Sequence, residues 1–372
     1  MDASLEVTET IREAADQIFS HSFAVYRVHP ASAAKIQAAY KTAVGFFRES
    51  SVSTTKSSQD DVNGNITRRR RDLVERYRRV KNGNLYGYNI PLESKELYRT
   101  WHNPAPEITR EYHGGDKKQE EKQQLDNFRN QQPWPSDEFC VASFHLAKEL
   151  HQLLSECLQH MIVLGHSMHE QKRNNVENDA SFSKSSREHR QQRKIKSSSP
   201  PPKKRFRTSA DVAPDHFDAR NENDSISNIC DNESDEKDLL WPSFRSSLCP
   251  LDFFFYHNRV PNAVNCSEHI DRGALIVVCL TDVPGLEVHS SASQTFSFQC
   301  PERLVHNENL YQERMDDLCC SDLVCIMAGD QLSKVLTLSK STLTPNACVH
   351  RVRNPLKCAR VSMSYELRLD DC

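Results

Sequence analysis

The sequence has no run of about 18 uncharged apolar residues, so we expect no membrane-spanning helix. Residues 1–17 are acidic and lack an apolar segment, which argues against a secretory or organellar targeting signal. The 13 cysteines are scattered, and none forms a C-x-x-C pair. We therefore expect reduced thiols rather than a disulfide framework, and we interpret Cys319, Cys320 and Cys325 as core residues rather than zinc ligands.

Neither sign of charge dominates the chain. The 48 Lys and Arg residues stand against 51 Asp and Glu residues, which gives a formal net charge of -3. This balance excludes a uniformly basic nucleic-acid binder and a polyacidic protein. Apolar residues make up only 37% of the chain, and the mean hydropathy is -0.69. We therefore expect a good part of the chain to lie outside any packed core.

Composition divides the chain into three parts. Residues 1–165 are expected to be mostly helical, with helices over 5–18, 31–47 and 139–165 and a strand over 22–28. Residues 166–238 are interpreted as a disordered charged insertion. Within it, residues 184–207 hold ten basic residues and one acidic, and residues 215–238 hold nine acidic residues and two basic. Residues 239–372 have a different, β-rich texture.

Two basic segments could contact other molecules. Residues 68–81 carry eight basic side chains, but Leu73, Val74 and Tyr77 lie at helical spacing among them, which favours a solvated helix face over a nucleic-acid-binding helix. The stretch PPPKKRFR (200–207) resembles a nuclear-import signal, with a charge-balanced linker as the alternative. We therefore expect a cytoplasmic location, a nuclear location or both.

The C-terminal part consists of short apolar runs separated by turn signals. Such spacing, without long helices, is typical of an antiparallel sandwich or barrel. In the last run Val361 and Met363 alternate with Ser362 and Ser364, as in a half-buried strand. The runs cover residues 251–258, 274–280, 286–290, 295–300, 322–329, 334–340 and 359–369.

His269 and Asp271 lie just before the apolar run 274–280. On an extended segment residues two apart point to the same side, so an imidazole and a carboxylate converge here as two metal ligands must. A third nitrogen ligand would complete a two-histidine, one-carboxylate triad with open positions for substrate and dioxygen. His350, late in the β-rich part, is the best candidate. The alternatives are a polar surface turn for the first pair and a buried core histidine for His350.

Arg360 and Ser362 again lie two residues apart on one predicted strand. A guanidinium group and a hydroxyl group on the same face suit a carboxylate, because both donate hydrogen bonds to it. Together with a metal triad, such a pair fits an enzyme that binds a 2-oxoacid at both of its ends. The alternative is an outward strand face with a salt bridge.

The C-terminal third resembles the plant-type iron(II)/2-oxoglutarate dioxygenases, the isopenicillin N synthase-like superfamily. Tyr256 matches the second tyrosine of that family's Asn-Tyr-Tyr motif. The other matching segments follow in the family's order. They are His269-Ile270-Asp271, Gly273-Ala274-Leu275, Val283-Pro284-Gly285-Leu286-Glu287-Val288, Ala328-Gly329-Asp330, Val349-His350-Arg351-Val352 and Arg360-Val361-Ser362.

The resemblance implies an α+β fold, with a double-stranded β-helix (jelly roll) over residues 239–372 backed by the N-terminal helices. It implies iron(II), 2-oxoglutarate as cosubstrate and dioxygen, and a small-molecule substrate that is hydroxylated or desaturated with release of succinate and carbon dioxide. The implied iron ligands are His269, Asp271 and His350. The implied binding residues for the distal carboxylate of 2-oxoglutarate are Arg360, Ser362 and Tyr256.

Two departures from the family pattern stand out. Phe254 occupies the position where the family usually has Asn, which removes one polar contact to the oxoacid. Asp271 and His350 are separated by 78 residues (350 - 271 - 1), more than is usual, and we assign the excess to residues 301–320. Because of these two departures an alternative remains open, in which the chain is a catalytically silent jelly-roll protein with a binding or regulatory role. Such a protein could associate with nucleic acid through the basic segments.

Overall fold

The computed structural model describes residues 6–51, 59–92, 94–104, 117–194, 247–257, 260–290, 297–304, 320–339, 341, 343–355 and 358–370. The chain divides into two units, Met1–Met168 with Trp241–Cys372, and His169–Leu240. Of the second unit only the end of helix α5 (Asp137–Lys194) is described. Residues 195–238 of the predicted insertion, with the import-like stretch, lie outside the described residues.

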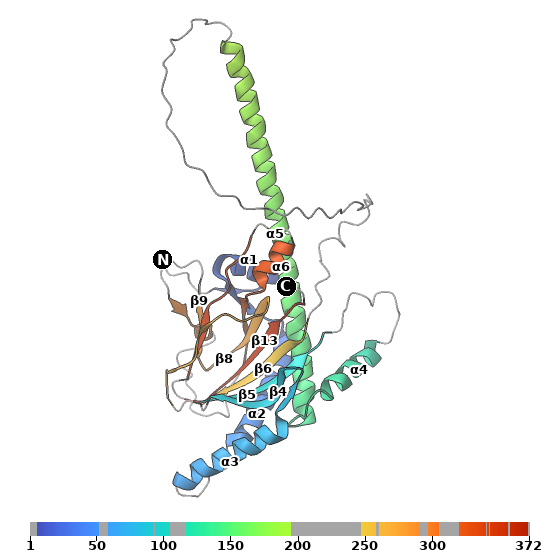
Figure 1. The fold of residues 1–372 in the computed structure, drawn as a ribbon, viewed down its shortest axis with the longest axis vertical. Coiled ribbons are helices and arrows are strands. Elements are labelled where there is room, and N and C mark those ends of the chain that lie inside the picture. Colours follow the sequence, from blue (N-terminus) through green and yellow to red (C-terminus); the bar gives the residue numbers. More distant parts are fainter. Residues whose placement is uncertain are drawn as a thin grey trace, which may run out of the picture. The chain divides into compact units, whose positions relative to one another are not determined.

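A nine-stranded sheet forms the centre of the first unit (Figure 1). Its four middle strands come from the β-rich C-terminal part, whereas the outer strands come from the N-terminal part. In spatial order the strands are β1 (Val7–Thr8), β2 (Phe23–Arg27), β11 (Cys320–Ala328), β8 (Leu275–Thr281), β13 (Arg360–Leu367), β6 (Cys249–Tyr256), β5 (Lys95–His102), β4 (Asn84–Leu92) and β3 (Arg79–Lys81).

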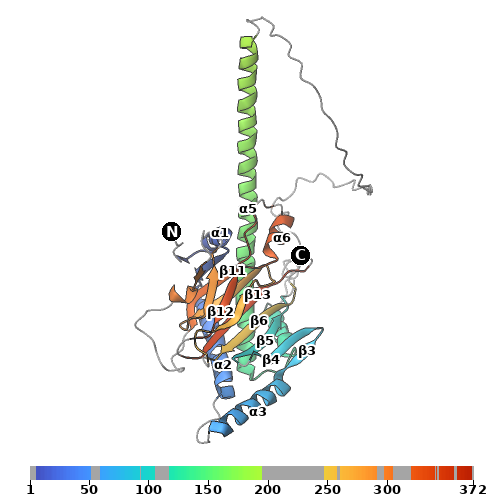
Figure 2. The ribbon, with the colours of Figure 1, turned by 60° about the vertical axis from the view of Figure 1, so that its left-hand side comes forward.

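A second, four-stranded sheet lies against the first, and its strand β12 is visible beside β11 and β13 in Figure 2. Its order is β10 (Phe298–Gln299), β9 (Leu286–His289), β12 (His350–Arg353) and β7 (Val264–His269). From β6 onward the chain passes back and forth between the two sheets, with only β9 and β10 following one another in the same sheet. Side chains of β8 and β11 pack with Leu286 and Val288 of β9 in one apolar cluster, so the sheets face each other.

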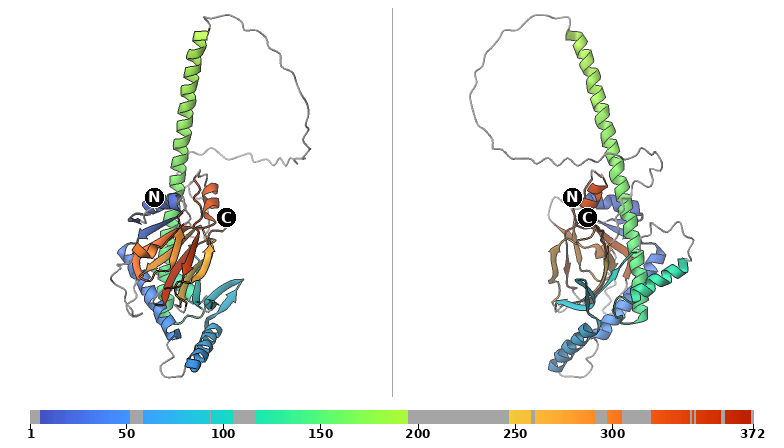
Figure 3. Two further views of the ribbon diagram at one scale, coloured as in Figure 1. Left: turned by 90° about the vertical axis from the view of Figure 1, so that its left-hand side faces the viewer. Right: turned by 45° about the vertical axis from the view of Figure 1, so that its right-hand side comes forward.

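Helices cover the other face of the large sheet, and they gather on one side of the strands in Figure 3. They are α1 (Ile11–His21), α2 (Pro30–Ser51), α3 (Gln59–Tyr77) and the first half of α5, whereas α4 (Lys117–Arg129) packs on α5 through Phe128 and Phe144. Their apolar side chains pack with alternate residues of the strands, such as Phe253, Val361 and Met363. The mixed helical and β architecture that the sequence predicts is thereby confirmed, as is the alternation along residues 361–364.

The basic segment 68–81 is a helix end followed by a strand, α3 and β3. Tyr77 is buried, and Leu73 and Val74 pack on the helical core, as a helix face requires. Arg70 turns inward and pairs with the buried Glu96 at 2.8 Å. Among the described helices none is long and apolar enough to cross a lipid bilayer.

Two helix boundaries differ from the prediction. Helix α1 begins at Ile11 rather than at residue 5, because Thr10 and Glu13 form a capping box there. Helix α5 continues past Gly165, where the sequence predicts its end. The glycine is needed for another reason, since a Cβ atom on it would lie 2.1 Å from the Ser341 hydroxyl oxygen.

One predicted strand is a helix, and one strand of the large sheet was not predicted. The run 334–340, predicted as a strand, lies in helix α6 (Leu332–Leu338). Its buried residues Leu332, Val335 and Leu336 have the i, i+3, i+4 spacing of a helix face, which a short apolar run conceals. Strand β5, which the sequence does not signal, joins the large sheet through its pairing with β6.

Candidate metal centre and adjoining cavity

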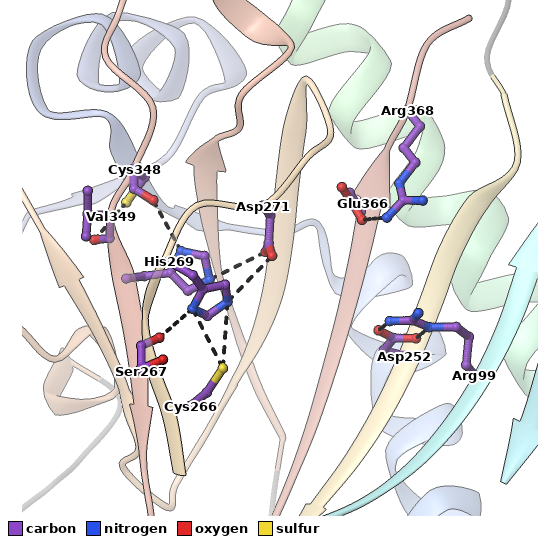
Figure 4. Close-up of polar contacts among 11 residues, drawn as sticks. Arg99, Asp252, Cys266, Ser267, His269, Asp271, Cys348, Val349, Glu366 and Arg368 are labelled. Carbon is purple, nitrogen blue, oxygen red and sulfur yellow. Dashed lines mark hydrogen bonds and ion pairs between the residues drawn. The ribbon is translucent and has the colours of Figure 1, made fainter. Parts of the chain in front are cut away.

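His269, Asp271 and His350 converge on one point. Figure 4 shows the His269 ring facing the Asp271 carboxylate. Strand β12 pairs with β7 so that His350 lies directly opposite His269, which closes the long gap in sequence. The Nε2 atoms of His269 and His350 lie 3.6 Å and 3.4 Å from the two carboxylate oxygens of Asp271. One ligand atom from each residue lies within 4.8 Å of the other two, so a single ion can contact all three.

Backbone carbonyl groups orient both imidazole rings. The Nδ1 atom of His269 lies 2.7 Å from the Ser267 carbonyl oxygen, and that of His350 lies 3.2 Å from the Cys348 carbonyl oxygen. Because a carbonyl oxygen only accepts, each Nδ1 is the donor, so in the neutral form of each ring the lone pair lies on Nε2, where a metal ion can bind. This is the tautomer that a ligating histidine needs.

The charges of the three side chains are coupled. Burial acts to raise the pKa of Asp271, but the hydrogen bond from His350 and the charges of both histidines outweigh it, so that the pKa is lowered. The pKa of His269 is raised to about 9, chiefly because the protonated ring donates a hydrogen bond to the Cys266 sulfur and also because it donates to the Ser267 carbonyl. In the absence of metal the site therefore holds an anionic carboxylate beside a readily protonated imidazole.

The loop that carries Asp271 is held by the end of β11. The Asp330 amide donates to the Asp271 carbonyl at 2.9 Å, and the Gly329 amide donates to the Ala274 carbonyl at 3.0 Å. A Cβ atom on Gly329 would lie 2.0 Å from the Gly273 carbonyl oxygen, so only glycine permits this approach. The backbone of Gly329 and Asp330 thus positions a candidate ligand, a contribution that the sequence does not reveal.

A cavity of about 650 Å³ adjoins the three side chains. One wall consists of alternate residues of β5, β6 and β13, whose opposite faces pack on the helices. Strand pairing arranges these residues in rows across the wall. Lys95, Tyr256 and Arg360 form one row, because Tyr256 is the register partner of both others, and Arg99, Asp252 and Ser364 form another.

Arg360 is the largest fully buried side chain of the wall. Its Nε donates to the Val283 carbonyl oxygen at 3.0 Å, and its Nη2 lies 2.8 Å from a carboxylate oxygen of Glu302. The guanidinium carbon lies 5.4 Å from the centre of the Tyr256 ring. Nη1 is buried and has no hydrogen-bond partner among the described residues, so Arg360 keeps one donor for a further acceptor.

Ser362 and Phe254 lie next to this row, on the same wall. Ser362 is buried and faces the cavity together with Arg360, as their spacing predicts. Where the related motif has Asn, the Phe254 ring faces the ammonium group of Lys95, with Nζ 4.5 Å from the ring centre. The Lys95 ammonium group of strand β5 thus lies beside the position at which the related motif has the polar Asn side chain.

The rest of the wall carries two ion pairs (Figure 4). Arg99 donates to both carboxylate oxygens of Asp252, at 2.6 Å and 2.5 Å. Arg368 lies 2.6 Å from Glu366. Because each cation has its own carboxylate, this part of the cavity is polar without a large net charge.

Sequence reasoning therefore finds the triad, Arg360, Ser362 and Tyr256 at one cavity, but it misses Lys95 and Glu302. Lys95 lies on the unpredicted strand β5. Glu302 belongs to the short helix η2 (Pro301–Leu304), at the start of the segment interpreted as excess length. Neither residue belongs to a motif. Strand pairing brings Lys95 to the site, and helix η2 brings Glu302 to Arg360.

No protein-family model and no curated protein sequence matches the chain. Solved structures do. A "putative 2OG-Fe(II) oxygenase family protein" from Caulobacter crescentus aligns with a TM-score of 0.50 at 14% identity, covering 98% of this chain and 87% of its own. The chain has the fold of that 2OG-Fe(II) oxygenase family protein. The low identity limits this similarity to the fold.

Two further structures align less closely. A full-length protein from Neurospora crassa, in complex with alpha-KG and 5-formyluracil, has a TM-score of 0.49 at 14% identity, covering 97% of this chain and 78% of its own. The dioxygenase for auxin oxidation (DAO) in rice has a TM-score of 0.46 at 12% identity, covering 96% and 77%.

The residues present fit both implied groups. When both imidazoles are neutral, their two ring nitrogens and one carboxylate form the donor set of a non-haem iron(II) site, and the carbonyl groups select the tautomers that leave Nε2 for the metal. The buried, unpartnered Nη1 of Arg360 fits a carboxylate in the same cavity. These two features are independent of the fold similarity.

Proposed function

We propose that the two sheets form the jelly roll of an iron(II)- and 2-oxoglutarate-dependent dioxygenase that oxidises a small organic molecule. His269, Asp271 and His350 hold the iron, and Arg360, Ser362 and Tyr256 bind the distal carboxylate of 2-oxoglutarate. The observation that carries this proposal is the convergence of three ligand atoms within 4.8 Å of one another at the edge of a cavity that also contains a buried arginine.

The residues contribute binding, orientation and exclusion of water. When bound, iron(II) and 2-oxoglutarate supply the oxidation, in which dioxygen is consumed, the oxoacid becomes succinate and carbon dioxide, and the substrate is oxidised. Asp271 and the two imidazoles, in their neutral form, would hold the metal ion beside the cavity that would receive the oxoacid. Arg360 and Tyr256, both buried, fix the oxoacid in one direction and keep bulk water from it.

Succinate release tests the proposal. The full chain is incubated with iron(II), ascorbate and 2-oxoglutarate, with a panel of small organic substrates, and compared with His350→Ala and with His160→Ala, an exposed histidine on α5. We expect iron-dependent succinate from the wild type and from His160→Ala, and a loss of about a hundredfold or more in His350→Ala, since removal of a metal ligand abolishes binding. Equal succinate release by His350→Ala would contradict the proposal.

A silent binding protein is the alternative, and one observation favours it. The Arg360 guanidinium group already donates a hydrogen bond to the Glu302 carboxylate. Part of the group that would bind the cosubstrate is therefore occupied by a residue of the protein. Binding of iron(II) and 2-oxoglutarate without succinate release over the whole substrate panel would support this alternative. Turnover would exclude it.

A further inference from the structure

The charge of Arg360 is already balanced within the fold. The side chains of Arg360 and Glu302 are 1% and 0% exposed, and they lie 2.8 Å apart. Glu302 also accepts a hydrogen bond from the Leu286 amide at 3.1 Å, which holds its carboxylate in place. A carboxylate that approaches Arg360 from the cavity therefore meets a hydrogen-bond donor, Nη1, but little net positive charge.

Among the described cations of this wall, Lys95 is the one that forms no ion pair with a carboxylate. It is the register partner of Tyr256 from the side opposite to Arg360. Its Nζ lies 4.5 Å and 5.6 Å from the ring centres of Phe254 and Tyr256, and no hydrogen bond or ion pair joins this ammonium group to any of the described residues.

The neighbouring carboxylates are engaged elsewhere. Both oxygens of Asp252 accept from Arg99, Asp271 faces the two histidines, and Glu302 faces Arg360. An ammonium group in this partly closed wall loses hydration without gaining a counter-ion. Burial lowers the pKa of Lys95, and an anion that enters the cavity would favour the charged form of this side chain.

We propose that Lys95 is the second cation of the oxoacid site and supplies the charge that Glu302 removes from Arg360. This inference rests on the proposed function. The 2-oxoglutarate dianion has one carboxylate for the metal and one for the wall. At the wall, Arg360 and Glu302 sum to zero, Lys95 adds one positive charge, and the distal carboxylate cancels it. In this arrangement Arg360 orients the distal carboxylate through a hydrogen bond, and Lys95 supplies the positive charge that balances it.

Binding measurements without turnover test this inference. 2-Oxoglutarate is titrated calorimetrically into the full chain with Mn(II) in place of iron(II). Lys95→Met, which keeps the length and removes the charge, should weaken binding roughly tenfold to a hundredfold, the range of a lost charged hydrogen bond. Pyruvate, a 2-oxoacid without a distal carboxylate, should bind wild type and Lys95→Met equally. Lys148→Met is the matched control, because that lysine is exposed and pairs with Glu121 on the surface.

A second substitution gives the inference its sharpest test. In Lys95→Met, the further change Glu302→Gln frees the charge of Arg360 and should restore most of the lost affinity for 2-oxoglutarate. Glu302→Gln alone should bind 2-oxoglutarate more tightly than wild type, and the ligand should raise its melting temperature more than that of wild type. Because Glu302→Gln removes the carboxylate partner of the buried Arg360, its melting temperature without ligand should be lower than that of wild type, and the quantity compared is the rise that 2-oxoglutarate produces in each protein.

The outcomes separate the two proposals. If the wild type binds Mn(II) and 2-oxoglutarate but Lys95→Met binds 2-oxoglutarate equally well, the role of Lys95 is overturned and the proposed function stands. Equal losses for pyruvate and 2-oxoglutarate would also overturn it, because they would indicate a structural defect. A wild type that binds no 2-oxoglutarate in the presence of metal would contradict the proposed function itself.

Discussion

The tautomers of the two histidines at the candidate metal centre are set by backbone carbonyl oxygens two residues earlier in the chain. The Ser267 and Cys348 carbonyls accept from Nδ1 of His269 and His350, so each ring presents Nε2 to Asp271. Each carbonyl belongs to the residue two positions before its histidine, so the local chain alone fixes the orientation of each ring. The three ligands are therefore oriented before any ion binds.

Metal affinity should increase with pH up to about 9. The pKa of His269 is raised to about 9, chiefly by its hydrogen bond with Cys266, so below that pH a metal ion must displace a proton. We expect Mn(II) affinity to fall by up to about tenfold per pH unit between pH 8.5 and 6.5. Equilibrium titration at several pH values measures this.

Cys266→Ala provides the comparison for this prediction. It removes the largest cause of the raised pKa of His269, so the fall in affinity should begin at lower pH than in the wild type. Identical profiles for the two proteins, or affinity independent of pH over this range, would contradict the explanation.

At the scale of elements, β13 shows how one strand serves two purposes. Val361, Met363 and Tyr365 pack on the helices, whereas Arg360 and Ser362 line the cavity. Because side chains alternate between the two faces of a strand, the sequence predicts which residues of β13 face the helices and which face the cavity. Strand β5 has the same division, but its cavity-facing Lys95 and Arg99 have no motif to identify them.

The end of β11 should be sensitive to a single methyl group. In Gly329→Ala the new Cβ would lie 2.0 Å from the Gly273 carbonyl oxygen, so the loop that carries Asp271 must move. We expect a loss of about 1–3 kcal/mol in the free energy of unfolding and weaker metal binding. Urea denaturation and metal titration measure the two effects.

Gly45→Ala is the control for that substitution. Gly45 lies in helix α2, and nothing lies within 4 Å of the position of its added Cβ. This change should leave metal binding unaltered and add up to about 1 kcal/mol of stability. If Gly329→Ala behaved in the same way as Gly45→Ala, the loop would not depend on this contact.

At the scale of the first unit, the N-terminal elements complete the large sheet rather than only backing it. Strands β1 and β2 extend it beyond β11, and β5, β4 and β3 extend it beyond β6. Helix α3 is tied to this extension through Glu96, whose carboxylate receives hydrogen bonds from Arg70 and Tyr88 and lies 2.8 Å from His257. The cavity wall therefore depends on residues far apart in the chain.

Loss of the Glu96 charge should destabilise the protein. Glu96 is 2% exposed, and Glu96→Gln removes the carboxylate charge that lies 2.8 Å from the buried Arg70 guanidinium group. We expect a loss of about 3–5 kcal/mol in the free energy of unfolding. The exposed Glu75→Gln on α3 should change it by less than about 0.5 kcal/mol, and a similar effect of both changes in urea denaturation would refute this account of the tie.

We propose that residues 200–207 act as a nuclear-import signal. Replacement of Lys203, Lys204 and Arg205 by Ala in a fluorescent fusion of the full chain should shift the protein from the nucleus to the cytoplasm. An unchanged distribution would remove this hypothesis. A charge-balanced linker, the alternative, predicts that result.

The site was predictable where its residues are local to one another. His269 with Asp271 and Arg360 with Ser362 follow from spacing on a strand, and His350 follows from its order along the chain. Lys95 and Glu302 were not predictable. Lys95 meets Tyr256 through pairing of strands more than 150 residues apart, and Glu302 reaches Arg360 from a short helix without a motif.

The most direct test of the central claim is the visible absorption of the anaerobic protein with iron(II), as 2-oxoglutarate is added. A 2-oxoacid that chelates iron(II) produces a charge-transfer band, which neither component has alone. We predict a saturable band in the wild type that is absent in His269→Ala and His350→Ala. A wild type without the band, or variants that retain it in full, would contradict an iron and 2-oxoglutarate site at these residues.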